Sequence, residues 1–580
     1  MLRPDRMGPQ SRMLPTLSVL SGRFGSSDAS SVRVRCAIGL LIALHATAFV
    51  LMGQTEVGLV GKAAFLLMWA GLNFAAAVLW RRPIPAAISS LALLGTLILL
   101  SQFKHEKLWL TVDFVDLMII DRDTTAFLLQ ALPKLRLPAA TGVIVLSGLL
   151  IAASRFDPLR IRRRIALAGS MCCLGALVAL SMSFPTNLAE DFSGQNYVSK
   201  FARTGVEAVD ALIERGYLET DKTAPRTLNS AAAACKPSRK LPHIILLHDE
   251  SSFDITAVPG IKVPHGYSDF FRSQDGKARK LVVEGAGGPS WFTEYNVLTG
   301  LSARSYGPFA TSVTRMAAGH VKRGLPLSLR RCGYKTYSLY PFYGAFLGSR
   351  AFQTTAGVGN YLDMRDLGTR NFETDSFYFD QARKIIAKQA TNGPLFLYVY
   401  NVANHFPWDT RLRPNLTPDW RDPGNGSQVD EYIRRQSMTA HDYHAFLAQL
   451  AADFPHESFL IVRYGDHLPS LALRLMDPSL DEPAIAQRLE ASDPRYLTTY
   501  YAIDTVNFEP ADLSSALDTV DAPYLPLIIQ EAAGVPLGPS FQEQKTILSR
   551  CRGIFYRCAN GREARQFNRM LIQAGYITGL

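Results

Sequence analysis

The chain has 580 residues, of which 48% are hydrophobic and 19% charged, and its formal net charge is +11. The charge is unevenly placed, because residues 1–190 hold 19 Lys and Arg against 10 Asp and Glu, whereas the other 390 residues hold 42 against 40. A basic surplus confined to loops between apolar segments indicates a membrane rather than a nucleic acid as partner. These numbers exclude a purely cytosolic globular protein and a disordered chain.

Five apolar stretches in the first third have close to the ~20 residues that a membrane-spanning helix needs. They are Cys36–Gly53, Ala63–Trp80, Ile84–Gln102, Pro138–Ser154 and Ile165–Phe184. The first stretch begins too late for an ordinary signal peptide and lacks a small-residue cleavage site, so we expect an uncleaved anchor. The pattern predicts a cytoplasmic segment over residues 1–35 and a five-helix transmembrane domain over residues 36–192.

Arginines cluster before the first stretch, between the second and third, and between the fourth and fifth. Because positively charged loops stay in the cytoplasm, the amino terminus is expected inside and everything after Phe184 outside. The loop at residues 103–137 is long and partly amphipathic, which predicts helices that lie on the membrane surface. A sixth crossing in this loop is the alternative, and it would turn the large domain inward.

Four cysteines lie outside the apolar stretches: Cys235, Cys332, Cys551 and Cys558. An even number in an oxidising compartment allows two disulfides. The pairs Cys551–Cys558 and Cys235–Cys332 are preferred among the three possible pairings. Four reduced thiols are the alternative, which the opposite topology would require.

The pattern changes from about Tyr197, where short β-branched or aromatic runs alternate with helical stretches. The expected strands are His243–His248, Lys280–Glu284, Lys335–Tyr340, Leu395–Asn401 and Ser458–Arg463, and the expected helices include Ala382–Gln389 and Ile433–Asp453. Continuous apolar strands separated by helices predict an α/β domain with a mostly parallel central sheet covered on both faces. We place this domain at residues 240–580, after a polar linker at residues 193–239.

Ligands of such sheets gather beyond the carboxyl ends of the strands, and three expected strands lead into chemically active residue types. The first runs into Asp249 and Glu250, the second into a glycine-rich turn followed by Ser290, and a late strand into Gly465, Asp466 and His467. Each signal has a structural alternative, since acids and serines also cap helices. His248, just before the acids, could contact the metal ligands, but a core histidine with satisfied hydrogen bonds is the preferred interpretation.

Together these residues predict a metal-activated serine that attacks phosphorus. One divalent ion, Mn²⁺ or Zn²⁺ with Mg²⁺ possible, suits carboxylate, hydroxyl and imidazole ligands from Glu250, Ser290, Asp466 and His467. Such an ion would favour the alkoxide of Ser290, which could then attack phosphorus. His405, after the fourth strand, could bind the substrate phosphate or protonate the leaving oxygen.

The order of these motifs resembles the alkaline-phosphatase/sulfatase superfamily. Within it, the membrane-anchored transferases of phospho-headgroups are most similar: lipoteichoic acid synthases and the phosphoglycerol and phosphoethanolamine transferases. The resemblance rests on Glu250–Gly300, Asn404–Pro407 and Gly465–His467. It implies an extracytoplasmic, sulfatase-like catalytic domain held at the inner (plasma) membrane of a bacterium by five transmembrane helices.

Carried over residue by residue, the resemblance makes Ser290 both nucleophile and metal ligand and places His405 in the substrate pocket. The family's usual nucleophile is threonine, which leaves Thr293 as a rival, although the spacing from Ser290 to Glu294 matches the phosphoglycerol-transferring members. Of the family's glycerol-phosphate pocket only Arg350 remains here. It could bind a phosphate or form a surface salt bridge.

The leading hypothesis is therefore transfer of a phospho-headgroup from a membrane phospholipid to a hydroxyl of an envelope glycan or lipid. Phosphoglycerol from phosphatidylglycerol is favoured, and phosphoethanolamine from phosphatidylethanolamine is the alternative. A phosphodiesterase of the same fold would differ only in using water as acceptor, and a formylglycine sulfatase is disfavoured because Ser290 lacks the Pro-x-Arg signal. A non-catalytic envelope protein is the remaining alternative.

Overall fold

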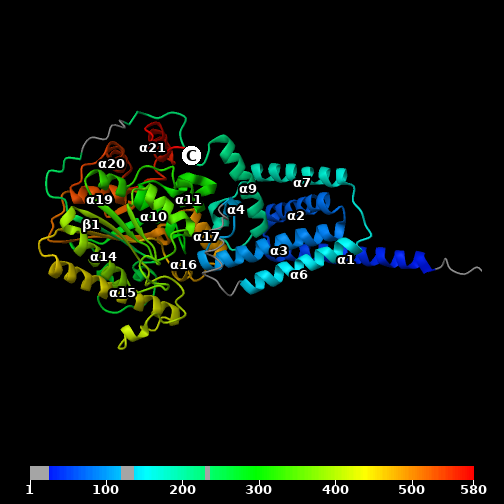
Figure 1. Cartoon of the computed structure of the whole chain (residues 1–580), viewed down its shortest axis with the longest axis horizontal. Helices are drawn as coiled ribbons and strands as arrows, with labels where there is room; N and C mark the ends of the chain where they lie inside the picture. The colour runs from blue at the N-terminus through cyan, green and yellow to red at the C-terminus, as the bar shows by residue number, and fades with distance from the viewer. Residues whose placement is uncertain (1–24, 119–135, 229–234, 580) are drawn as a thin grey trace, which may run out of the picture.

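A computed structural model of the chain describes residues 25–118, 136–228 and 235–579. Its long axis runs from a group of extended helices to an α/β domain (Figure 1).

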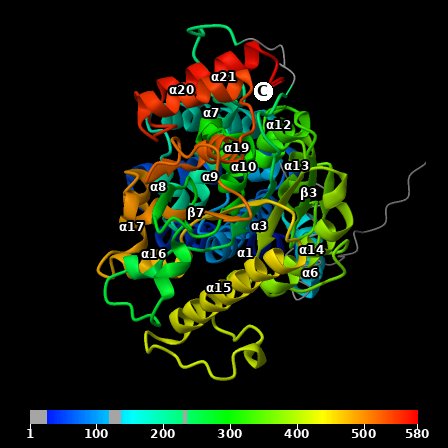
Figure 2. The same ribbon diagram turned by 90° about the vertical axis from the view of Figure 1, so that its left-hand side faces the viewer.

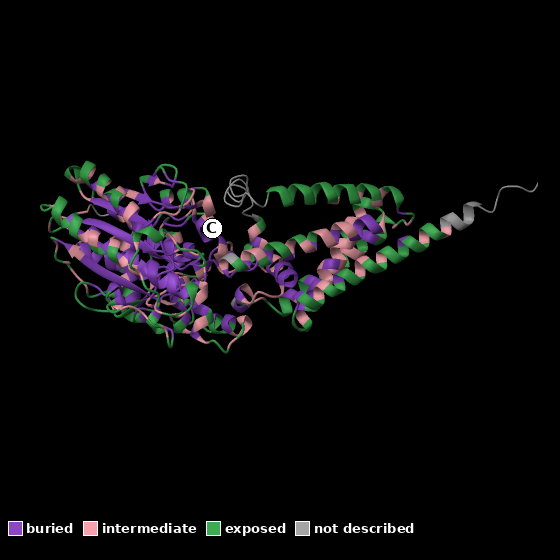
Figure 3. Cartoon of the chain, turned by 90° about the horizontal axis from the view of Figure 1, so that it is seen from below, coloured by how far each residue is buried: buried purple, intermediate pink, exposed green. Residues whose placement is uncertain are grey.

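Five helices of the amino-terminal part are long and apolar enough to cross a membrane. They are α1 (Gly25–Thr55), α2 (Gly58–Trp80), α3 (Pro83–Leu108), α6 (Arg136–Phe156) and α7 (Arg163–Ser183). The five predicted segments are thus confirmed as helices, and α2 packs against both α3 and α7. Most of their side chains are exposed or half-buried, in contrast to the α/β domain (Figure 3), as expected of helices that contact lipid.

The two parts are connected by the short helices α4 (Phe114–Met118) and α8 (Leu188–Phe192) and by the longer helix α9 (Tyr197–Glu214). Helix α9 lies in the segment expected to be a linker and packs against α2 and α7. Helix α4 lies in the loop expected on the membrane surface, and its Phe114 ring is 5.8 Å from that of Phe201 in α9. The rest of that amphipathic loop, residues 119–135, lies outside the described residues.

One sheet of eight strands forms the centre of the α/β domain. The strands are β1 (His243–Asp249), β2 (Arg279–Val282), β3 (Lys335–Leu339), β4 (Asn360–Leu362), β5 (Leu395–Asn401), β6 (Phe459–Gly465), β7 (Thr498–Val506) and β8 (Thr519–Asp521). Their order is β4-β3-β5-β1-β6-β7-β2-β8. Only β7 runs antiparallel to its neighbours, so the predicted mostly parallel sheet is confirmed, and each of the five expected strands is present.

Helices cover both faces of the sheet (Figures 1 and 2). Helices α14 (Asp375–Gln389) and α15 (Ser427–Asp453) lie on one face, and α10 (Ser290–Thr299), α12 (Leu325–Arg331) and α19 (Leu525–Ala533) lie on the other. The remaining helices are α11 (Val313–Ala317), α13 (Ser349–Thr355), α16 (Ser470–Met476), α17 (Glu482–Glu490), α18 (Pro494–Leu497), α20 (Pro539–Cys551) and α21 (Arg562–Gln573), with the 3₁₀ segment η4 (Ala303–Ser312).

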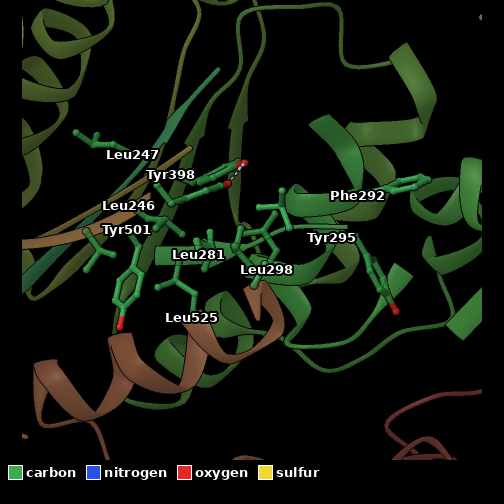
Figure 4. Packing of buried hydrophobic residues seen from close by; sticks show 14 of the residues in the cluster. Leu246, Leu247, Leu281, Phe292, Tyr295, Leu298, Tyr398, Tyr501 and Leu525 are labelled. Atoms are coloured by element: carbon green, nitrogen blue, oxygen red, sulfur yellow. Dashed lines mark hydrogen bonds between the residues drawn. The ribbon is translucent and has the colours of Figure 1, made fainter. Parts of the chain in front are cut away.

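The core lies between the sheet and these helices. Strands β1, β5 and β6 are buried at every position, which explains their continuous apolar sequences. Leu246 of β1, Leu298 of α10 and Leu525 of α19 belong to the same buried cluster (Figure 4). Strands β1, β5 and β6 therefore form the buried centre of the sheet, and the residues at their carboxyl ends are held by this core.

Both preferred disulfides are confirmed. Cys235 is bonded to Cys332 and Cys551 to Cys558. The first closes a loop of 97 residues and ties the chain before β1 to the end of α12, whereas the second closes a loop of seven residues after α20.

Candidate active site

The polar residues singled out from the sequence meet at the carboxyl end of the central strands. Glu250 directly follows β1, Asp466 and His467 directly follow β6, and β1 and β6 are parallel neighbours. Ser290 is the first residue of α10, which follows the glycine turn after β2. Because these strands end at the same edge of the sheet, their tips bring the side chains together.

The hydroxyl of Ser290 is held between an acid and an imidazole. Its Oγ donates to Glu250 Oε2 at 3.0 Å and lies 3.2 Å from His467 Nε2. Its position at the start of α10 places it where the free backbone N–H groups of a helix favour negative charge. The surroundings therefore suit a serine that becomes an oxyanion.

Two backbone features allow the tips of β1 and β6 to approach so closely. A Cβ at Gly465 would lie only 1.8 Å from the carbonyl oxygen of Ser252, so no other residue fits the first position of the Gly-Asp-His motif. Ser251 adopts a left-handed φ of 54°, and its backbone N–H donates to Asp466 Oδ1 at 2.7 Å. Strained backbone of this kind concentrates at functional sites.

The site strongly favours a positive charge between its two carboxylates. Burial alone raises the pKa of Glu250, but the hydrogen bond from His467 and the nearby histidine charges outweigh it and bring the pKa below its usual range. Burial lowers the pKa of His467, but the charge of Asp466 and the hydrogen bond to Glu250 outweigh it and raise the pKa to about 9. The buried Glu250 carboxylate thus stays ionised and attracts a cation.

A divalent ion fits this donor set. Asp466 Oδ2 and His248 Nε2 are buried, find no hydrogen-bond partner among the described residues, and lie 3.1 Å apart. Ligand atoms of His248, Glu250 and Asp466 lie within 4.8 Å of one another, and His467 Nε2 is 3.4 Å from both Glu250 Oε1 and Asp466 Oδ2. Carboxylate oxygens and imidazole nitrogens are the ligands that Zn²⁺ and Mn²⁺ accept.

His248 is fully buried in β1, as expected of a core histidine, and the structure adds that it faces Asp466. Its Nδ1 lies 2.8 Å from the hydroxyls of both Tyr398 and Tyr464, which orients Nε2 toward Asp466. A second imidazole nitrogen fixed in this way is typical of metal-binding histidines. Because side chains alternate along a strand, residues 248 and 250 are expected on the same face. This alternation is the feature of the sequence that could have indicated that His248 faces the same point as Glu250.

The hydroxyl of the rival nucleophile Thr293 is bonded to the backbone and not to the side chains of Glu250 or His467. It is fully buried, and its Oγ1 donates to the backbone oxygen of Asp466 at 2.6 Å. Glu294, four residues after Ser290, accepts instead from Gln353 at 2.8 Å and from Ser349 at 3.3 Å. The geometry therefore favours Ser290, although its role as nucleophile stays a prediction.

His405 lies beside the cluster, in an aromatic setting. Its ring is 4.9 Å from that of Phe372 and 5.7 Å from that of Phe342. Its Nδ1 lies 2.6 Å from the backbone oxygen of Phe406, which leaves Nε2 for a substrate. Burial lowers the pKa of His405, partly offset by the charge of Glu250.

Arg350 forms a salt bridge, which is one of the two roles that the sequence left open for it. Its Nη2 lies 2.9 Å from Asp363 and 3.0 Å from Asp366, with the side chain 46% exposed. Phosphate binding by Arg350 stays a prediction, and it would have to compete with these two carboxylates.

Residues 291–486 match the family described as Sulfatase. This stretch begins directly after Ser290 and contains Asp466 and His467. The chain therefore carries a sulfatase-family domain.

A curated relative is the capsular polysaccharide biosynthesis protein RkpI of Rhizobium meliloti (strain 1021), which is 28% identical over 272 residues. The match covers 44% of this chain and 47% of the relative, so the chain spans about half the length of the curated protein that it matches.

Solved structures similar to the chain include two bacterial transferases. Phosphoglycerol transferase GacH of Streptococcus pyogenes, in complex with sn-glycerol-1-phosphate, is 15% identical with a TM-score of 0.44, over 59% of this chain and 86% of that one. Lipooligosaccharide phosphoethanolamine transferase A (EptA) of Neisseria meningitidis is 10% identical with a TM-score of 0.45, over 84% of this chain and 98% of that one.

The arrangement predicts that His248 contributes to metal binding together with His467. We expect His248→Gln and His467→Gln each to weaken Mn²⁺ binding at least about tenfold, because each removes an imidazole nitrogen that faces Asp466. Titration calorimetry of the purified full-length protein measures this. His441→Gln is the matched control, since that side chain is 84% exposed. Unchanged Mn²⁺ affinity in His248→Gln, at an unchanged melting temperature, would make His248 a core residue only.

Proposed function

We propose that the chain is a metal-dependent transferase. It moves a phospho-headgroup from a membrane phospholipid, through a covalent intermediate on Ser290, to a hydroxyl of an envelope glycan or lipid. Phosphoglycerol from phosphatidylglycerol is the favoured donor group, on the spacing of Ser290 to Glu294 and the Leu-Thr-Gly that follows. Phosphoethanolamine from phosphatidylethanolamine is the alternative that the same site accommodates.

One observation carries this proposal. A serine hydroxyl at a helix N-terminus lies 3.0 Å from a buried glutamate and 3.2 Å from a buried imidazole, in a cluster that favours a cation. A structural role alone would not require Glu250, Ser290, Asp466 and His467 to converge, since buried carboxylates cost stability. Activation of a hydroxyl for attack on phosphorus would explain why these four residues converge.

The metal would be held by Glu250, Ser290, Asp466 and His467, with His248 directed at the same point. When bound, such an ion lowers the pKa of a coordinated hydroxyl and neutralises charge on a phosphate. Before attack, Glu250 and His467 hold Ser290 Oγ in place through the contacts described above.

The transfer then consists of two displacements at phosphorus. In the first, Ser290 gives up its proton to His405, Ser290 Oγ bonds to phosphorus, the bond from phosphorus to the diacylglycerol oxygen breaks, and His405 passes the proton to that oxygen. In the second, the acceptor hydroxyl gives its proton to His405, the acceptor oxygen bonds to phosphorus, and Ser290 Oγ leaves and takes the proton back from His405. Atoms and protons balance, because His405 begins and ends each displacement neutral and Ser290 begins and ends the cycle as a hydroxyl.

The acceptor is proposed to be a polysaccharide of the cell envelope. The name of the relative RkpI refers to capsular polysaccharide biosynthesis, and five apolar helices would hold the catalytic domain beside its lipid donor. The two disulfides support an oxidising compartment for the domain, which in a bacterium is the periplasmic side of the inner membrane.

Ser290→Ala is expected to reduce diacylglycerol release from phosphatidylglycerol at least about 10³-fold, because the covalent step is lost. The assay uses the full-length enzyme with Mn²⁺ and separate vesicles of phosphatidylglycerol and phosphatidylethanolamine. Thr293→Val, which keeps the side-chain shape, should stay within about tenfold of the wild type. Loss of activity in Thr293→Val but not in Ser290→Ala would reverse the assignment of the nucleophile.

The topology is tested by fusing a reporter enzyme that is active only after export. A fusion after residue 190 should be active, because five crossings place that point outside, and a fusion after Arg160 should be inactive, because the loop between α6 and α7 is arginine-rich. Inverted activities would contradict the proposed orientation.

A further inference from the structure

The end of helix α3 is in direct contact with the glycine turn that presents Ser290. A Cβ at Gly288 would lie 3.0 Å from the Cα of Leu108 and 3.1 Å from its carbonyl oxygen. A Cβ at Gly287 would lie 2.8 Å from the Cβ of Trp109. The turn and the helix end are therefore packed without space for even one additional methyl group.

The opposite side of the same turn is held by the residues that follow His467. Gly287 N–H donates to the backbone oxygen of Leu468 at 2.9 Å, and Gly287 forms an isolated parallel bridge with Pro469. The turn thus lies between a metal-binding strand tip on one side and the end of a membrane helix on the other. Glycine-rich backbone is flexible by itself, so these two contacts limit its freedom.

Trp109 is fixed in the protein and does not face lipid headgroups. A tryptophan at the end of a membrane helix ordinarily lies at the lipid–water interface, but Trp109 is only 2% exposed. Its ring stacks on that of His105 at 5.7 Å, and the guanidinium of Arg474, in α16, lies 5.5 Å from its centre. His105 Nε2 in turn lies 3.1 Å from the backbone oxygen of Phe192. The helix end is therefore anchored from several directions.

We propose that Leu108 and Trp109 form a positioning element of the catalytic site, which holds the Ser290 turn in register with Glu250 and His467. The proposal rests on the function proposed above. Displacing a nucleophile by about 1 Å can reduce the rate about 10²-fold, and Gly287 and Gly288 have no side chains that would resist such a shift. The transmembrane part thus takes part in building the site in addition to anchoring it.

The first test combines turnover with hydrogen–deuterium exchange in the full-length protein. Trp109→Ala should lower kcat for diacylglycerol release at least about tenfold, leave KM for the lipid within about twofold, and speed amide exchange in the peptide that contains residues 285–293. Trp109→Phe should restore most of both. The matched control is Trp80→Ala, at the other end of the membrane helices, which should change neither.

The second test enlarges the turn and leaves α3 intact. Gly288→Ala introduces no strain from a left-handed φ, since Gly288 lies outside that region, and the nearest atoms to its methyl group are backbone atoms of Leu108. It should reduce kcat as Trp109→Ala does. The double variant should lose less than the product of the two single losses, because both changes act on one contact.

The outcomes separate the two proposals. Unchanged exchange at residues 285–293 in Trp109→Ala, with a wild-type kcat, overturns the positioning role. A loss of kcat in Trp109→Ala that Trp109→Phe does not restore, with unchanged exchange, also overturns it. Faster exchange in a protein whose wild type shows no turnover with any lipid supports the contact and contradicts the proposed function instead.

Discussion

Two buried carboxylates, Glu250 and Asp466, face a common point at the tips of two neighbouring parallel strands, and the site depends on a positive charge there. They are 3% and 0% exposed, so water does not solvate them. Removing each carboxylate from water costs several kcal/mol unless it is paired. His467 supplies a charge with its raised pKa, and a divalent ion would supply a larger one. The glycine at position 465 and the left-handed backbone at Ser251 are the local features that make this approach possible.

The same arrangement explains why Ser290 lies at the start of α10, the helix that follows β2. Strand β2 runs parallel to β1, so its following turn reaches the same edge of the sheet, and α10 begins with its positive end toward the cluster. The turn carries glycines because it passes between the backbone of α3 and the segment after β6. Fold, metal-binding cluster and membrane part therefore converge on a few residues around Ser290.

Much of this could be predicted from the sequence, and the exceptions have physical reasons. The membrane helices and the strands β1, β5 and β6 are long apolar runs, whose signal is local. Strands β4 and β8 have three residues each, and β7 alternates with many polar residues, so their signal is weak. The orientation of His248 depends on Tyr398 and Tyr464 of neighbouring strands. The contact of Trp109 with Gly287 joins positions 178 residues apart, which no local pattern reveals.

The central claim is that Ser290 carries the phospho-headgroup. The most direct measurement is the intact mass of the full-length protein after incubation with phosphatidylglycerol and Mn²⁺, followed by peptide mapping of the modified residue. The account predicts one glycerol-phosphate adduct on the peptide that contains Ser290, and its absence in Ser290→Ala. An adduct on Thr293, or turnover of the lipid by the Ser290→Ala protein at the wild-type rate, would contradict it.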